Sequence, residues 1–138
     1  MDDRREALII ELREFLGTPW HHNQAEKGIA CDCVGLLRKG GEKIGLNLPP
    51  FPEKYDRLAR NGQIRVYLET NFTPISIEQM AKADVVMFQA NGFDNHVGVI
   101  TKPMTVIHAS QRTGMVVEHT IDGVWLKMLR RGGVYRWD

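Results

Sequence analysis

Residues 95–109 read Asn-His-Val-Gly-Val-Ile-Thr-Lys-Pro-Met-Thr-Val-Ile-His-Ala, which is two apolar runs on either side of Lys102-Pro103. Both runs are rich in β-branched residues, which favour strands. Proline has a fixed backbone angle that suits a turn. The sequence therefore predicts an antiparallel hairpin whose strands cover residues 96–101 and 104–109.

This hairpin carries two histidines. If Ile100 opposes Met104 across a three-residue loop, the same register places His96 directly opposite His108 on one face. The Cβ atoms of directly opposed residues lie about 4.5–5.5 Å apart. One imidazole can then orient the other through its second nitrogen, as a general base and its orienting partner require.

The alternating pattern continues beyond the hairpin, whereas the N-terminal half has helical spacing. Further strands are predicted at residues 84–89, 114–118 and 133–136. Helices are predicted at 3–16, from Asp32 or Cys33 to about Ile44 with a cap at Gly45, and at 53–70 with a break near Asn61-Gly62; residues 71–82 are predicted as a loop with a short helical turn. Helices first and strands afterwards indicate an α+β fold. A length of 138 residues indicates a single domain, 1–138.

The second predicted helix begins with a thiol, Cys33, and contains the pair Gly40-Gly41, which lowers helix propensity by roughly 1 kcal/mol per glycine. The N-terminus of a helix presents unpaired N–H groups and a partial positive charge, and both favour a thiolate. Gly35 allows another backbone or a substrate to approach closely. We therefore expect Cys33 and His96 to form a nucleophile and base for acyl transfer.

Four short motifs occur in a recognisable order: Gly17-Thr18-Pro19-Trp20, Asp32-Cys33-Val34-Gly35-Leu36, Asn95-His96-Val97-Gly98-Val99 and Ile107-His108-Ala109. Together they resemble the NlpC-type cysteine peptidases of the cell wall, over residues 8–136. The Cys31-Asp32-Cys33 run is most similar to the phage-tail and prophage branch of that superfamily.

The resemblance implies a papain-like core, with the cysteine at a helix N-terminus packed on an antiparallel sheet. It implies Cys33 as nucleophile, His96 as general base and His108 as the residue that orients His96, with no cofactor or metal. The implied substrate is the peptidoglycan stem peptide, cut typically after γ-linked D-glutamate, and phage tail proteins are the implied partners. Trp20 stands where the family usually has a tyrosine near the thiol. The candidate substrate-binding residues are Trp20, His22 and Asp32, of which Asp32 also suits a helix cap.

The bulk properties exclude some other classes. The formal net charge is +1, which gives no attraction to nucleic acid. No apolar run approaches the roughly 20 residues of a membrane-spanning helix, so no membrane insertion is expected. The first residues lack the apolar core of a signal peptide. We therefore expect synthesis in the cytoplasm, followed by action in the cell wall or periplasm as part of a virion or tail.

Three alternatives use the same residues. A structural tail-tip protein could keep the fold without activity, and an acyltransferase could use the same three residues. A zinc site could be built from Cys31, Cys33, His96 and His108. Outside these sets, Cys31 alone is expected to be a structural thiol, and His119 and Asp94 to be surface positions.

Overall fold

The computed structural model describes residues 3–50, 62–90 and 93–137, and within them six strands form one antiparallel sheet. The strand order is β3-β8-β4-β5-β6-β7. These strands are β3 (Thr73–Ile75), β4 (Val85–Ala90), β5 (Phe93–Lys102), β6 (Thr105–Ser110), β7 (Met115–Thr120) and β8 (Gly133–Arg136). A two-stranded ladder joins β1 (Ala25–Glu26) to β2 (Ala30–Cys31). The helices are α1 (Asp3–Arg13), α2 (Cys33–Lys43), α3 (Gln63–Asn71) and α4 (Gly123–Arg131), with a 3-10 turn η1 (Ile77–Gln79).

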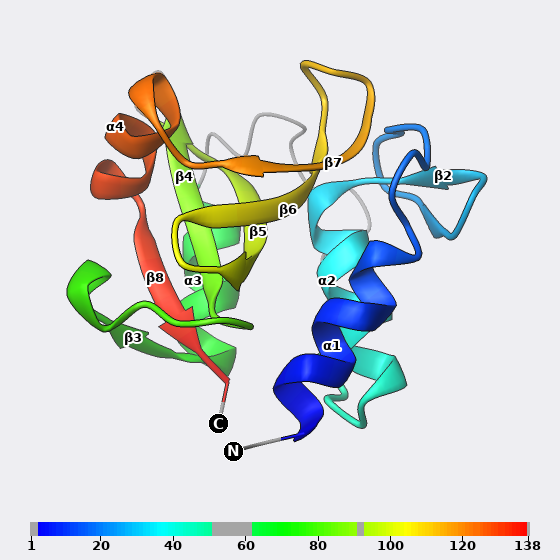
Figure 1. Ribbon diagram of the computed structural model, residues 1–138, viewed down its shortest axis with the longest axis horizontal. Helices are drawn as coiled ribbons and strands as arrows, with labels where there is room; N and C mark the ends of the chain where they lie inside the picture. Colours follow the sequence, from blue (N-terminus) through cyan, green and yellow to red (C-terminus); the bar gives the residue numbers. More distant parts are fainter. Residues whose placement is uncertain (1–2, 51–61, 91–92, 138) are drawn as a thin grey trace.

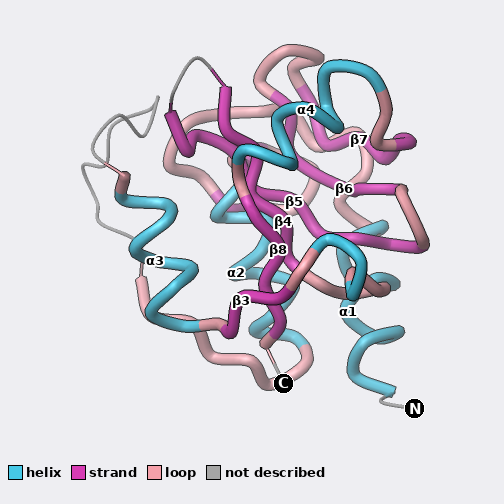
Figure 2. Tube along the Cα trace, turned by 90° about the vertical axis from the view of Figure 1, so that its left-hand side faces the viewer, coloured by secondary structure: helices cyan, strands magenta, loops and turns pink. Residues whose placement is uncertain are grey.

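Helices cover both faces of the sheet. Figure 1 shows α1 and α2 on one side and α4 on the other, and in Figure 2, seen from the α4 side, the strands lie in front of α2. Alternating strand residues face the two layers, because successive side chains of a strand point to opposite faces. Val97 and Val99 pack with residues of α1, α2 and α3, whereas Phe88 and Ile100 pack with Met128 and Leu129 of α4. This arrangement confirms the predicted α+β fold.

The glycine pair in α2 has a packing role as well as a cost in helix propensity. A Cβ on Gly40 would lie 2.5 Å from Leu12 Cδ2 and 3.0 Å from Leu8 Cδ1, both on α1. A side chain there would therefore force the Leu12 side chain to move. The predicted end of this helix is confirmed, since α2 ends at Lys43 and Gly45 has a positive φ of 81°.

The register of the hairpin differs from the prediction. Val99 pairs with Ile107 and Ile100 with Val106, and the ladder then shifts so that Lys102 pairs with Thr105. The predicted pairing of His96 with His108 is therefore wrong by two residues. The physical reason is a bulge at Thr101 combined with a tight turn, in which Met104 adopts a left-handed φ of 58°. A shift of two residues keeps both histidines on the same face.

Other elements differ from the predicted boundaries. The predicted helix 53–70 corresponds to α3 from residue 63 onward, and residues 53–61 of that prediction lie outside the described residues. The predicted loop 71–82 contains the short strand β3, which pairs with β8. The helix α4 was not predicted at all. None of the helices in the described ranges has the length and apolar composition that a membrane span requires.

A buried carboxylate ties α1 and β8 to the start of β4. Asp84 is 0% exposed and accepts hydrogen bonds from Arg136 Nε at 2.8 Å, from Arg136 Nη2 at 2.7 Å and from the Ala81 amide at 2.7 Å. Arg5 Nη1 lies 3.3 Å from the same carboxylate. A buried charge needs such partners, because it has lost its hydration. Asp84 thus joins three segments that are far apart in sequence.

Candidate active site

The site begins at the N-terminus of α2, where Asp32 caps the helix. One carboxylate oxygen accepts a hydrogen bond from the Gly35 amide at 2.7 Å and the other from the Asn23 amide at 2.6 Å. Gly35 has no room for a side chain, because a Cβ there would collide with the Gln24 carbonyl oxygen. The predicted helix start, the Asp32 cap and the close approach at Gly35 are all confirmed. Together they fix the first turn of α2 and the thiol that it carries.

Cys33 is the first residue of α2 and is only 8% exposed. Burial, and then the neighbouring Asp32 carboxylate, raises the pKa of the Cys33 thiol to about 12. The backbone amides of Val97, Val34 and Cys33 itself act in the opposite direction. The helix terminus favours a thiolate, but the loss of hydration on burial outweighs it. The resting group is a neutral thiol.

The Cys33 sulfur lies next to β5, at the peptide group that joins His96 to Val97. The Val97 amide is a hydrogen-bonding group for the sulfur, and the Val97 side chain belongs to the same buried cluster as Cys33. The His96 side chain lies on the other face of β5, beside Phe88 and Trp125. No hydrogen bond joins the sulfur to the His96 ring in the described part of the chain. Cys33 and His96 are thus neighbours through the backbone of β5.

Three histidines form a continuous hydrogen-bonded row, which we call the histidine triplet (His96, His108 and His119). His96 Nε2 lies 2.5 Å from His108 Nδ1, and His108 Nε2 lies 2.7 Å from His119 Nε2. His119 Nδ1 lies 2.8 Å from the Thr120 carbonyl oxygen. Neighbouring rings are edge to face, with centroids 4.7 Å and 4.9 Å apart. The predicted contact between His96 and His108 therefore forms despite the different register.

Sequence reasoning missed His119. It was expected on the surface, because the predicted strand ended at residue 118, whereas β7 continues to Thr120. His108 pairs with Val117, so His119 is two residues further along on the same face. If the predicted strand had continued to Thr120, the alternation of its side chains would have placed His119 on the same face as Val117. The third histidine is therefore a correction to the predicted site.

Aromatic side chains cover the triplet. The Trp125 ring of α4 has centroid distances of 6.0, 4.9 and 5.2 Å to His96, His108 and His119. Phe88 stacks against His96 at 5.9 Å. Burial, and then the nearby His119, lowers the pKa of His96 to about 4. Burial, followed by the two neighbouring rings, also lowers the pKa of His108. The rings of His96 and His108 are thus neutral at pH 7.

The other candidate residues lie near the start of α2. Trp20 is partly buried against the cluster that contains both cysteines. Its backbone forms an isolated parallel β-bridge with that of Cys31. His22 is half-buried in the following loop. The oxygens of Asp32 are both already used by backbone amides. Substrate contacts for Trp20, His22 and Asp32 stay predictions.

Both cysteines are free thiols. Cys31 is 0% exposed, and its sulfur donates to the Asp32 carbonyl at 3.2 Å, in keeping with a structural role. Among the described residues, no three or more cysteine, histidine or acidic side chains are arranged to hold a metal ion. The zinc alternative therefore has no ligand cluster in this part of the chain.

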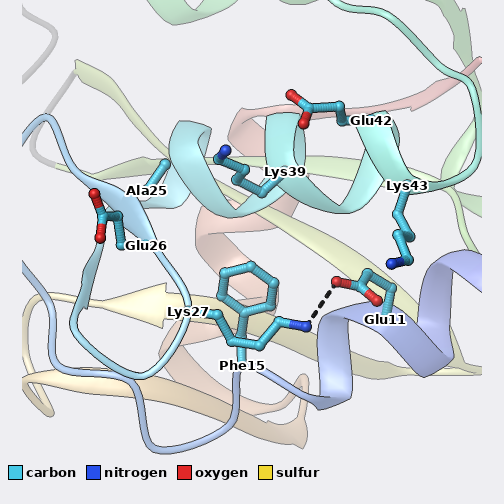
Figure 3. A pocket seen from close by; sticks show the side chains of 8 residues that line it. All are labelled: Glu11, Phe15, Ala25, Glu26, Lys27, Lys39, Glu42 and Lys43. Atoms are coloured by element: carbon cyan, nitrogen blue, oxygen red, sulfur yellow. Dashed lines mark ion pairs between the residues drawn. The ribbon is translucent and has the colours of Figure 1, made fainter.

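Two of the cavities lined by described residues border α2. One of about 80 Å³ borders the start of α2 and includes Asp32, Val34 and Gly35 in its wall. The other, of about 510 Å³, lies between α1, β1 and α2 (Figure 3). It contains Lys27, whose ammonium lies 3.0 Å from Glu11 and 2.7 Å from Glu14. None of the candidate site residues lines the larger cavity, so this cavity is separate from the candidate active site.

Comparisons with known proteins agree with this architecture. The model of the NlpC/P60 family matches residues 17–133. A probable endopeptidase of Corynebacterium glutamicum is 25% identical over 117 residues, which cover 85% of this chain and 48% of the relative. The chain thus spans about half the length of the curated relatives it matches.

Solved structures show the same fold. A Staphylococcus aureus protein described as similar to a lipoprotein of the NLP/P60 family superposes with a TM-score of 0.74 and 21% identity, covering 99% of this chain and 42% of its own. The peptidoglycan hydrolase RipB of Mycobacterium tuberculosis gives a TM-score of 0.70 and 16% identity, covering 97% and 64%. At these identities the likeness establishes the fold alone.

Proposed function

We propose that this chain, which belongs to the NlpC/P60 family, is a cysteine peptidase that cleaves amide bonds in peptidoglycan stem peptides. One observation carries the proposal: a thiol at a capped helix N-terminus meets the strand that bears His96, and His96 is hydrogen-bonded to His108. A nucleophile, a base and a group that orients the base are the parts that acyl transfer by a thiol requires. The structurally similar RipB is described as a peptidoglycan hydrolase, which supports peptidoglycan as the substrate.

In the proposed reaction, Cys33 is the nucleophile and His96 Nδ1 is the base. His96 Nε2 is engaged by His108, so Nδ1 is the nitrogen left for the thiol proton. As the sulfur attacks the carbonyl carbon, its proton moves to Nδ1, and the Cys33 amide at the helix terminus stabilises the oxyanion. The C–N bond then breaks, and the proton on His96 passes to the leaving amine. Water, deprotonated by His96, attacks the thioester and releases the acid and the thiol.

The neutral resting pair sets a condition on this reaction. The pKa of Cys33 is raised and that of His96 is lowered, so the proton stays on sulfur until substrate is present. Substrate binding must therefore bring the imidazole nitrogen to the sulfur. Catalytic hydrogen bonds are often long before substrate binds.

The finer parts of the proposal rest on sequence motifs. The bond that we propose is the one between γ-linked D-glutamate and the diamino acid, which the family resemblance implies. The Cys31-Asp32-Cys33 run supports a phage or prophage tail protein with other tail proteins as partners. We propose that such a protein is made in the cytoplasm and acts in the cell wall or periplasm.

A second candidate is a structural tail-tip protein without activity. The observation that favours it is the buried, neutral thiol, which has no hydrogen bond to His96 in the described residues. The two candidates make opposite predictions for cleavage, and a single experiment separates them.

The experiment is mass spectrometry of soluble muropeptides after incubation with the reduced protein. New fragments from a cut stem peptide, absent with Cys33→Ala, would support the peptidase and identify the bond. Cys31→Ala is the matched control, since it removes a buried thiol two residues away and should retain cleavage. A folded protein that leaves all fragments and intact sacculi uncut would favour the tail-tip protein.

A further inference from the structure

We propose that His119 is a positioning residue, which fixes the proton on His96 Nε2 and so keeps His96 Nδ1 free to act as the base. The inference rests on the proposed function and extends the site by one residue. It follows from the order of hydrogen bonds in the histidine triplet, whose members come from β5, β6 and β7, three strands that lie side by side (Figure 1).

The argument starts at the Thr120 carbonyl. A carbonyl oxygen can only accept a hydrogen bond, so the His119 Nδ1 that lies 2.8 Å away must carry the proton. A neutral imidazole has one donor and one acceptor nitrogen. His119 Nε2 is therefore an acceptor in the neutral ring.

The same rule then determines the two inner rings. Because His119 Nε2 accepts, His108 Nε2 must donate, and His108 Nδ1 becomes an acceptor. Because His108 Nδ1 accepts, His96 Nε2 must carry its proton. The remaining nitrogen of His96, Nδ1, then has a free lone pair. A single main-chain oxygen on β7 thus determines which nitrogen of a ring on β5 can receive the thiol proton.

Because His108 is buried, its ring needs His119 as a partner to keep this arrangement of protons. His108 is 0% exposed and its Nε2–H donates to His119, so an apolar residue at position 119 would remove the acceptor of a buried donor. Trp125 covers the same rings from α4. An unpaired buried donor is costly. His108 would therefore move its proton to Nδ1 and donate to His96, whose own proton would shift to Nδ1. That form of His96 cannot accept a proton from Cys33.

The first test needs no variant. Nitrogen-15 NMR of the ring nitrogens at pH 8, where an unperturbed imidazole is neutral, reports which nitrogen of each histidine carries hydrogen. We expect protons on His96 Nε2, His108 Nε2 and His119 Nδ1, with scalar couplings across both N–H···N bonds. A proton on His96 Nδ1 in the wild-type protein would overturn the proposal.

The second test compares His119→Leu with His119→Gln. Leucine removes both hydrogen bonds, whereas the amide of glutamine can accept from His108 and donate to Thr120. We expect His119→Leu to move the His96 proton to Nδ1 and to lower kcat about tenfold or more with KM unchanged, at the lower end of what a general base contributes. His119→Gln should restore both values. An unchanged His96 spectrum in a folded His119→Leu protein, or equal behaviour of the two variants, would refute the positioning role.

The exposed His21→Leu variant controls for the loss of a histidine and should leave the His96 spectrum unchanged. The two proposals can fail separately. If the wild-type protein cleaves no peptidoglycan, the NMR measurement still decides how the triplet is protonated. If it cleaves and the His119 variants show no effect, only the positioning role is lost.

Discussion

His96 Nε2 lies 2.5 Å from His108 Nδ1, although the two residues are not opposite each other in the β5–β6 ladder. The contact is diagonal, and Gly98 leaves room beside it: a Cβ on Gly98 would lie 2.5 Å from Val106 Cγ2 and 3.3 Å from His108 Cβ. Diagonal neighbours on one face are within reach of long or aromatic side chains. The site thus depends on the missing side chain at residue 98 as well as on the histidines.

The first prediction concerns His108 and separates hydrogen bonding from packing. Glutamine can accept from His96 Nε2–H, whereas leucine cannot. We expect His108→Leu to lower kcat about 100-fold or more and His108→Gln to retain several times more activity, since a positioned base contributes roughly 10²–10⁴-fold. Muropeptide cleavage rates measure the difference. Equal losses in two equally stable variants would contradict the orienting role.

The second prediction concerns the reactivity of the thiol. Burial and Asp32 raise the pKa of Cys33 to about 12, and only the thiolate reacts with alkylating agents. We expect slow labelling by iodoacetamide at pH 7, with a rate that rises about tenfold per pH unit between pH 8 and 11. Peptide mass spectrometry reports the labelled residue, and Cys33→Ala shows the contribution of Cys31. Fast labelling that is independent of pH near 6 would instead reveal a preformed thiolate.

The third prediction concerns acid. The unfolded chain protonates its histidines near pH 6.5, whereas burial lowers the pKa of folded His96 to about 4. Between these values the unfolded state binds more protons than the folded state, so the free energy of unfolding falls as the pH falls. The slope is about 1.4 kcal/mol per pH unit for each such ring. Urea titrations from pH 7 to 4 measure it. His96→Leu should flatten the curve, and the exposed His21→Leu should not.

The fourth prediction concerns Asp84, which is fully buried between Arg5 and Arg136. Asp84→Asn keeps the shape but removes the buried negative charge that Arg5 and Arg136 contact, and we expect a loss of about 3 kcal/mol or more in the free energy of unfolding. The matched control is Glu6→Gln, which breaks a surface ion pair with Lys82 and should cost under about 1 kcal/mol. Chemical denaturation measures both. A loss for Asp84→Asn no larger than the control would show that the buried carboxylate is not an anchor.

Local signals were sufficient for several parts of the fold. Asp32 before Cys33 predicts a capped helix start, because the signal lies within four residues of sequence. The residues of β8 were predicted without error, and the strands of the hairpin were found to within a few residues. The register was wrong because a bulge at Thr101 depends on how the turn closes, and no residue there marks it in the sequence.

Packing decided what the sequence could not. The helix α4 is nine residues long, and its contact with the triplet through Trp125 exists only after the sheet has formed. The pKa of the Cys33 thiol is a second property that the local sequence does not determine. A helix terminus favours a thiolate locally, but the pKa of Cys33 is raised by burial, to which distant residues such as Val97 contribute. Burial is a property of the whole fold.

The turn between β5 and β6 has a consequence for how related sequences can diverge. His96 and His108 stay on one face only while the spacing between them keeps its parity, because each added or removed residue turns the following strand over. A single deletion within residues 101–104 would point His108 toward α2, whereas a change of two residues would keep it in the triplet. Related sequences can therefore differ by substitutions in this turn. Insertions and deletions there must change its length by an even number of residues, unless a second bulge compensates.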